Sequence, residues 1–267
     1  MTFDDFCRHF GFQSHPFARA VPEAGLLHHR TFTEATTRLS LAIQSRTPAL
    51  LTCEPGLGKS TLLGTLADGL DKSKAHLVYI GLSSCGPFGL MGQLAERYGA
   101  RTKRSAAQTA QGVLDVLASS SRDEILIVDD AHRLPSVSLD ELRLLSNLDF
   151  DRTPPFALLI VGQPAHRDHL AQPELSSLWQ RIAIRTSLTP LTDKETFEYL
   201  ERRARAAGAK ANLFRPAAAA RIFEKTRGVP REINNVAMAA LFAAAAATKR
   251  HVDLAEVEDA YFDQVNA

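Results

Sequence analysis

The chain has 267 residues, 45% of them hydrophobic and 23% charged, which excludes a disordered tail, a collagen-like fibre and a small disulfide scaffold. At about 150 residues per domain, this length indicates one large domain or a core with a small satellite. The net charge is only +1, so binding to a polyanion needs a local basic patch.

The cysteines and the amino terminus indicate a cytoplasmic protein. Cys7, Cys53 and Cys85 are odd in number and form no CxxC pair, which is typical of reduced thiols. Residues 1–5 are acidic and precede no apolar region, unlike a signal peptide. The Ala-rich stretch 236–247 is shorter than the roughly 20 residues that span a bilayer. It therefore predicts a buried helix, and we expect no membrane partner.

Residues 1–45 form an amino-terminal segment. Phe10-Gly11-Phe12 and Pro16-Phe17 indicate irregular structure, whereas residues 33–45 have a helical pattern. Because this segment directly precedes the first predicted strand, we expect the segment and its helix to pack on the core.

Strand and helix patterns alternate through residues 46–190. Apolar runs bounded by turn residues predict five strands, at 49–52, 76–80, 125–128, 156–161 and 182–188. Between them, Ser105 and Gln108 form a capping-box pattern, and Leu139, Leu142 and Leu145 recur at every third residue. This alternation predicts an α/β fold in which crossover helices flank a parallel five-stranded sheet.

Residues 191–267 predict four helices and no strand. The signals are a capping box at Thr192, a first-turn proline at Pro216, helix ends at Gly208 and Gly228, and a cap at Asp253. The sequence therefore predicts an α/β core followed by an all-helical lid.

A glycine-rich loop directly follows the first predicted strand, and leucines at helical spacing follow the loop. Such a loop turns consecutive N–H groups toward a polyphosphate, while Lys59 neutralises the outer phosphates and Ser60 offers its hydroxyl to Mg²⁺. ATP and Mg²⁺ are the predicted cofactors. The predicted nucleotide-binding residues of the loop are Glu54, Pro55, Gly56, Leu57, Gly58, Lys59, Ser60 and Thr61.

The loop departs from the GxxxxGK[ST] pattern at one position. Cys53 occupies the place of the first glycine, and its Cβ is expected to alter the turn slightly and to lower nucleotide affinity. The alternative is a chance glycine-rich turn. The strand before the loop and the helix after it favour phosphate binding.

Two carboxylates follow the third predicted strand, where open α/β sheets place their ligand chemistry. We expect Asp129 to hold Mg²⁺ through water and Asp130 to polarise the attacking water. Glutamate is more usual in the second role, so the reach of Asp130 is shorter by about 1.5 Å and slow hydrolysis is expected. A plain aspartate helix cap is the alternative, but the adjacent phosphate-binding pattern favours an NTPase.

With these motifs, the sequence resembles the AAA+ ATPases, and within them the ExeA and TniB/TnsC group. The resemblance covers nearly the whole chain. Residues 10–17 are similar to that group's opening segment, which implies a position near the adenine. Residues 160–164 are similar to its fourth strand, which implies that Gln163 senses the γ-phosphate. By the same resemblance, Arg181 is the arginine finger that acts on the neighbouring subunit's nucleotide.

The resemblance extends to residues 228–234, which are similar to the sensor 2 motif of the lid and imply that Arg231 contacts its own subunit's phosphates. A guanidinium can neutralise charge on the transferred phosphoryl group, which supports both arginine roles. Surface ion pairs are the alternative for both arginines. The predicted catalytic residues are Asp130, Arg181, Lys59 and Gln163.

A small basic cluster is the candidate contact with DNA. Arg101, Lys103 and Arg104 follow the helix predicted after the second strand, and Ser84 lies in the loop before that helix. The resemblance implies that this region faces the centre of an assembly. Repeated along stacked subunits, such a patch would bind double-stranded DNA without sequence preference. A solvated basic turn is the alternative.

The resemblance implies a homo-oligomer, either a ring or a helical filament, that hydrolyses ATP slowly at subunit interfaces. We favour a transposition regulator of the Mu B kind that assembles on double-stranded DNA, selects target DNA and recruits or activates a transposase. The alternatives are an ExeA-type secretion ATPase and a nucleotide-gated scaffold with little hydrolysis. The chain ends at Ala267 together with the predicted lid, without the membrane anchor of ExeA proteins, which favours the DNA function.

Overall fold

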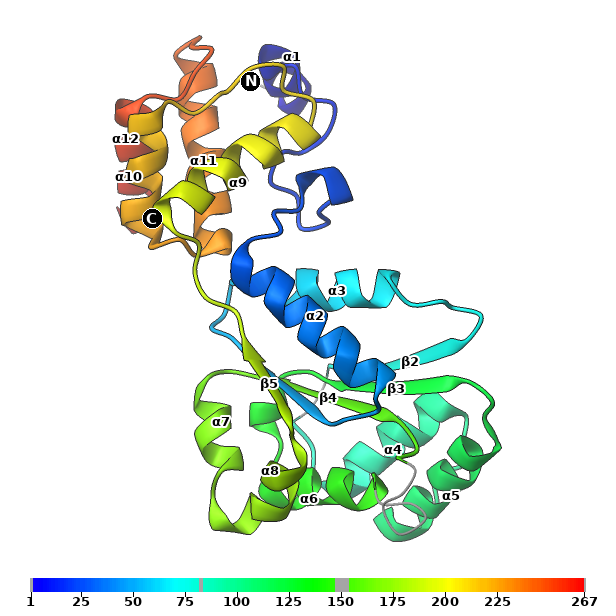
Figure 1. Ribbon diagram of the computed structural model, residues 1–267. Coiled ribbons are helices and arrows are strands. Elements are labelled where there is room, and N and C mark those ends of the chain that lie inside the picture. Colours follow the sequence, from blue (N-terminus) through cyan, green and yellow to red (C-terminus); the bar gives the residue numbers. More distant parts are fainter. Residues whose placement is uncertain (1, 82–83, 147–153, 267) are drawn as a thin grey trace. The chain divides into compact units, whose positions relative to one another are not determined.

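The computed structural model describes residues 2–81, 84–146 and 154–266 (Figure 1). The chain divides into two compact units. One comprises Met1–Arg30, Gly56–Thr61 and Thr189–Ala267, and the other comprises Thr31–Pro55 and Leu62–Leu188. The second unit contains the sheet, and the first is mainly helical.

The predicted five-stranded parallel sheet is confirmed, with the strand order β2-β3-β4-β1-β5. The strands are β1 Ala49–Thr52, β2 Ala75–Ile80, β3 Asp123–Val128, β4 Ala157–Gly162 and β5 Ile184–Ser187. β4 is buried along its whole length, whereas the edge strand β5 alternates between half-buried and exposed residues. Uninterrupted apolar runs such as that of β4 are typical of strands that are covered on both faces.

Helices cover both faces of this sheet (Figure 1). α2 and α3 lie over one face, and α4 to α8 lie over the other, where their apolar residues form one core with the sheet. The bounds are α2 Arg30–Gln44, α3 Lys59–Asp68, α4 Pro87–Tyr98, α5 Ala106–Ser119, α6 Ser136–Leu145, α7 Ala165–Leu170 and α8 Ser176–Arg181. The Ser105 hydroxyl accepts the N–H of Gln108 at 3.2 Å, which is the forward half of the predicted capping box.

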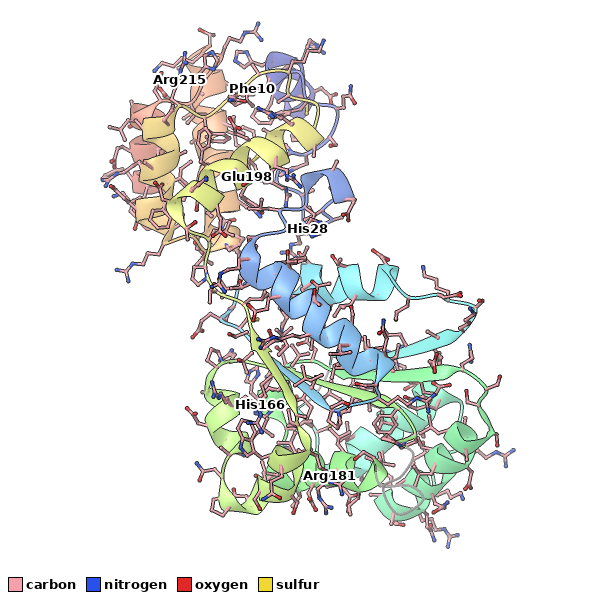
Figure 2. All side chains as sticks on the ribbon, viewed as in Figure 1. Phe10, His28, His166, Arg181, Glu198 and Arg215 are labelled. Carbon is pink, nitrogen blue, oxygen red and sulfur yellow. The ribbon has the colours of Figure 1, made fainter. Side chains whose placement is uncertain are left out.

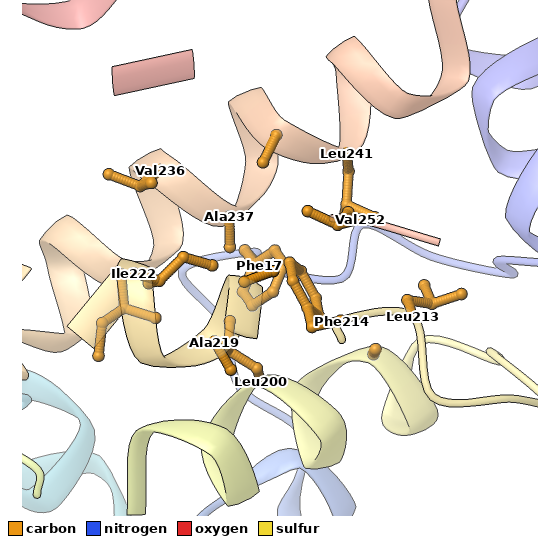
Figure 3. Packing of buried hydrophobic residues seen from close by; sticks show 14 of the residues in the cluster. Phe17, Leu200, Leu213, Phe214, Ala219, Ile222, Val236, Ala237, Leu241 and Val252 are labelled. Carbon is orange, nitrogen blue, oxygen red and sulfur yellow. The ribbon is translucent and has the colours of Figure 1, made fainter. Parts of the chain in front are cut away.

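The helical unit contains the four helices predicted after residue 191: α9 Asp193–Ala206, α10 Pro216–Thr226, α11 Pro230–Ala246 and α12 Leu254–Asn266. Phe17, Leu200 and Phe214 are among the residues of its core (Figure 3). α9 begins with the predicted capping box at Thr192, and α11 is the buried Ala-rich helix predicted at 236–247. Within the described part of the chain, no helix combines the length and apolar character needed to cross a bilayer.

The amino-terminal segment differs from its prediction. Phe3–Phe10 form helix α1, with a capping box between Thr2 and Asp5, which the sequence analysis does not predict, whereas residues 11–18 are irregular as predicted. Phe6 and Phe10 are buried in the core of the helical unit. Residues 1–30 therefore belong to the helical unit, and only the remainder of the predicted 1–45 segment belongs to the unit with the sheet.

A buried arginine ties this segment to α9. The side chain of Arg203 is only 3% exposed, and its guanidinium donates to the carbonyl oxygens of Pro16 at 3.1 Å and Ala18 at 2.7 Å and to the Tyr199 hydroxyl at 3.2 Å. A buried charge is tolerated only when hydrogen bonds replace its lost water. The segment after α1 therefore depends on Arg203 for its path along the helical unit.

Candidate nucleotide-binding site

Three strands of the sheet end at one edge, and a residue of the predicted site follows each. Asp129 follows β3, and its N–H donates to the carbonyl oxygen of Ile80 at 2.9 Å. Cys53 follows β1, and its N–H donates to the carbonyl oxygen of Gly162, the last residue of β4, at 3.1 Å. Gln163 follows β4. The chain therefore leaves these three strands at the carboxyl edge, which is where open α/β sheets bind their ligands.

The glycine-rich loop connects β1 to α3. Gly56 and Gly58 have φ angles of +91° and +96°, in the left-handed region where a Cβ is unfavourable. α3 begins at Lys59, which is half-buried, and Ser60 is exposed in its first turn. The N–H groups of a helix N-terminus, together with a lysine, attract a phosphate group.

Cys53 replaces the first glycine of the pattern without a backbone penalty. It is 5% exposed, and its φ angle is not positive. Only a residue in the left-handed region needs glycine for conformational reasons. The Cβ of Cys53 is therefore accommodated without backbone strain, which differs from the expected alteration of the turn.

Arg231 approaches the glycine-rich loop within the same compact unit. Its N–H donates to the carbonyl oxygen of Gly56 at 3.2 Å. A Cβ on Gly56 would lie 3.0 Å from both the Cβ of Arg231 and the Cγ1 of Val229, so glycine is needed for space as well as for its φ angle. α11 begins at Pro230, which places the exposed Arg231 in its first turn. The structure thus brings together Gly56 and Arg231, two of the predicted nucleotide-binding residues.

The two aspartates at the end of β3 differ in environment. Asp129 is 4% exposed, and its Oδ1 accepts the N–H of Asp130 at 2.7 Å, while its Oδ2 accepts the hydroxyl of Tyr79 at 2.7 Å. Asp130 is half-buried and has a left-handed backbone with φ +48°, which aspartate tolerates better than most residues. Burial and the bond to Asp129 raise the pKa of Tyr79, so the phenol keeps the proton that it donates to the Asp129 carboxyl group.

The oxygen donors suit Mg²⁺. Asp129 supplies a carboxylate, and Mg²⁺ binds through one or two protein oxygens while keeping waters and substrate phosphates. Among the described residues, no group of three or more His, Cys, Asp or Glu side chains is arranged to hold a metal ion. In phosphoryl-transfer sites, the bound phosphates usually supply part of the metal's ligands.

The remaining predicted catalytic residues lie on the unit that contains the sheet. Gln163 is exposed, and its carbonyl oxygen accepts the N–H of His166 at 2.9 Å. Arg181 is half-buried and is the last residue of α8 (Figure 2). Close to Arg181 in sequence, the guanidinium carbon of Arg185 lies 3.5 Å from the centre of the Trp179 ring. This cation–π contact holds β5 to α8.

The residues predicted to contact DNA are exposed. Arg101, Lys103 and Arg104 lie between α4 and α5, and Ser84 lies ahead of α4. The N–H of Lys103 donates to the Thr109 hydroxyl at 2.9 Å, which ties the basic segment to the first turn of α5. Their side chains are accessible, and their contact with DNA stays a prediction.

Sequence reasoning gave no site role to two side chains near these residues. One is Tyr79, whose partner lies on the neighbouring strand. The other is His166, which is 1% exposed and packs against Gly162, so that a Cβ on Gly162 would lie 3.0 Å from its ring (Figure 2). Neither ring nitrogen of His166 has a hydrogen-bond partner. The sequence signal for this packing is a small residue, Gly162, at the end of a strand shortly before His166.

The buried His166 is expected to make the stability of the fold sensitive to acid. Burial, and secondarily His169 and His132, lower its pKa from the ordinary 6.5 to about 4. The folded protein therefore binds its proton less readily than the unfolded chain, and this contribution to stability is lost as the pH falls from 6.5 toward 4. We expect the free energy of unfolding to fall by at most about 3 kcal/mol over this window from this group. Urea unfolding at several pH values measures the slope.

His166→Leu removes the titrating ring and should flatten that slope. His28→Leu is the matched control, because His28 is exposed and its ring contacts the solvent-exposed Glu23. An unchanged slope in His166→Leu would show that other groups cause the acid sensitivity.

Comparisons with known proteins agree with this geometry. A family model described as an AAA domain matches residues 42–170. General secretion pathway protein A of Aeromonas hydrophila is 29% identical over 246 residues, which are 90% of this chain and 45% of that protein. The chain thus spans less than half the length of this curated relative.

Two solved structures are similar in fold. Cdc6p of Pyrobaculum aerophilum has a TM-score of 0.74 at 20% identity, with 93% of this chain and 70% of that chain covered. The Aeropyrum pernix ORC1 protein, solved in complex with DNA, has a TM-score of 0.67 at 19% identity, with 94% and 69% covered. With an AAA domain matched at residues 42–170, the chain has the fold of the AAA+ P-loop NTPases.

Proposed function

We propose that the chain is an ATPase that binds ATP with Mg²⁺ and hydrolyses it. The observation that supports this most is the glycine-rich loop, whose Gly56 and Gly58 have left-handed φ angles at the start of α3. A second observation is the buried carboxylate of Asp129, followed by Asp130, at the carboxyl edge of the same sheet as β1. Phosphate binding and metal binding are the two requirements of phosphoryl transfer.

Each residue has a proposed role in this reaction. The backbone of the loop and Lys59 hold the phosphates, and Ser60 and Asp129 hold the metal, which neutralises charge on the phosphates when bound. Asp130 orients and polarises the attacking water. Gln163 senses the γ-phosphate, Arg231 contacts the phosphates of its own subunit, and Arg181 acts on the site of a neighbouring subunit in a homo-oligomer.

Lys59→Ala tests the proposal. We expect phosphate release to fall by about 100-fold or more, because one preorganised charge on the transferred group is lost. Lys72→Ala is the matched control, since Lys72 is an exposed lysine in the turn after α3 and should leave the rate unchanged. Release of phosphate that is equal in both variants would contradict the enzyme function and favour a nucleotide-gated scaffold.

The pathway that the ATPase serves has two candidates. The relative from Aeromonas hydrophila is a secretion-pathway protein, which supports the ExeA-type function over the transposition function. The DNA function is supported by the exposed Arg101, Lys103 and Arg104 and by the fold likeness to the ORC1 protein solved with DNA. A transposase as partner rests on the sequence resemblance alone.

The same turnover assay separates the two pathways. Stimulation by duplex DNA that weakens steeply with salt would support the DNA function, because counterion release dominates contacts with phosphates. Turnover that does not respond to duplex DNA would favour the secretion pathway.

A further inference from the structure

We propose that Tyr79 is a positioning residue that holds the carboxylate of Asp129 in the orientation that binds the metal. The proposal rests on the proposed function, because it assigns a residue to the Mg²⁺ side of the ATP site. It adds a group from β2, a strand that carries none of the residues predicted from the sequence.

The sheet brings the two residues together. β2 pairs with β3 in parallel, with Tyr79 opposite Ile127 and Ile80 opposite Val128. The N–H of Asp129 extends this ladder by one bond to the carbonyl oxygen of Ile80. Val78 and Ile80 point into the core that α4 to α8 share with the sheet, so Tyr79 points to the opposite face, over which α2 and α3 lie.

Gly81 provides the space for this side-chain position. A Cβ on Gly81 would lie 2.8 Å from Cε1 and 3.3 Å from the hydroxyl oxygen of Tyr79. The ring is therefore folded closely over the residue that follows β2. This packing directs the hydroxyl toward Asp129 although Tyr79 as a whole is 44% exposed.

The hydrogen bonds leave Asp129 oriented and still able to bind. Oδ1 accepts the N–H of Asp130 and Oδ2 accepts the Tyr79 hydroxyl, both at 2.7 Å. An ionised carboxylate has about four lone-pair sites, so these two hydrogen bonds do not by themselves exclude a metal ion or its water. Because Asp129 is 4% exposed, losing one charge-assisted bond cannot be offset by bulk water. The carboxylate would then turn away from the position that binds the metal.

The test is the dependence of nucleotide affinity on Mg²⁺. The dissociation constant of N-methylanthraniloyl-ATP is measured by fluorescence, once with Mg²⁺ and once with EDTA at equal ionic strength. For Tyr79→Phe, we expect the Mg²⁺-dependent gain in affinity to be about 10-fold smaller than for the wild type, the size expected for one hydrogen bond to a charged group. Affinity in EDTA should be unchanged.

Tyr98→Phe is the matched control. The Tyr98 hydroxyl is buried on α4 and has no hydrogen-bond partner, so the same chemical change should leave the Mg²⁺-dependent gain unaltered. Gly81→Ala is a second variant, which keeps the hydroxyl but crowds the ring, and it should also reduce the gain. Circular dichroism confirms that each variant is folded.

The outcomes separate this role from the proposed function. An equal Mg²⁺-dependent gain in Tyr79→Phe and wild type overturns the role of Tyr79 and leaves ATP binding intact. An equal loss of affinity in Mg²⁺ and in EDTA shows a structural role and also overturns the proposal. If the wild type binds the nucleotide in neither condition, the proposed function fails, and the role of Tyr79 fails with it.

Discussion

Replacing Asp130 with asparagine is expected to lower the rate of ATP hydrolysis by about 10²–10⁴-fold while ATP binding persists. Asparagine has almost the same shape but cannot accept the proton of the attacking water. It also tolerates the left-handed backbone of Asp130, at φ +48°, so the turn after β3 should remain intact. Single-turnover phosphate release and equilibrium nucleotide binding measure the two quantities separately.

Asp123→Asn is the matched control for this substitution. Asp123 is the first residue of the same strand, at the amino edge of the sheet, where it forms an exposed ion pair with Arg46 at 3.0 Å. An exposed pair contributes at most about 1 kcal/mol, so this variant should hydrolyse ATP like the wild type. Hydrolysis by Asp130→Asn at the wild-type rate would show that Asp130 is not the base.

Much of the sheet and its site could be predicted because the signals are local. Each strand is a continuous apolar run, and in parallel α/β sheets the carboxyl ends gather at one edge. Asp129 and the glycine-rich loop therefore had predictable places from their positions directly after strands. The left-handed glycines of the loop follow from the same pattern, because only glycine adopts those φ angles at little cost.

The parts that could not be predicted depend on contacts between distant residues. Tyr79 looks like an ordinary alternating residue of a strand, and its partner Asp129 is 50 positions away. α1 was also not predicted. Its Phe6 and Phe10 pack in the core of the helical unit, and this packing stabilises the helix more than helix propensity does. Its local signals are the capping box at Thr2, the helical spacing of Phe3, Phe6 and Phe10, and the left-handed Gly11 that ends it.

Replacing Arg181 with alanine is expected to lower steady-state turnover by about 10³-fold, the effect of an arginine that stabilises charge on the transferred phosphoryl group. Arg181 ends α8, between the buried residues Leu178 and Ile182, so its backbone is held firmly. Arg122→Ala is the control, because Arg122 is exposed in the turn before β3 and should not affect turnover.

Mixing decides whether Arg181 acts on its own subunit or on a neighbour. In a 1:1 mixture of Arg181→Ala and Lys59→Ala, about one quarter of head-to-tail interfaces combine an intact Lys59 with an intact Arg181 from the adjacent subunit. An arginine that acts between subunits therefore predicts recovery to about a quarter of wild-type turnover, whereas an arginine that acts within its own subunit predicts none. Inactivity of both variants with no recovery on mixing would place Arg181 on its own nucleotide, and full activity of Arg181→Ala alone would remove it from the reaction.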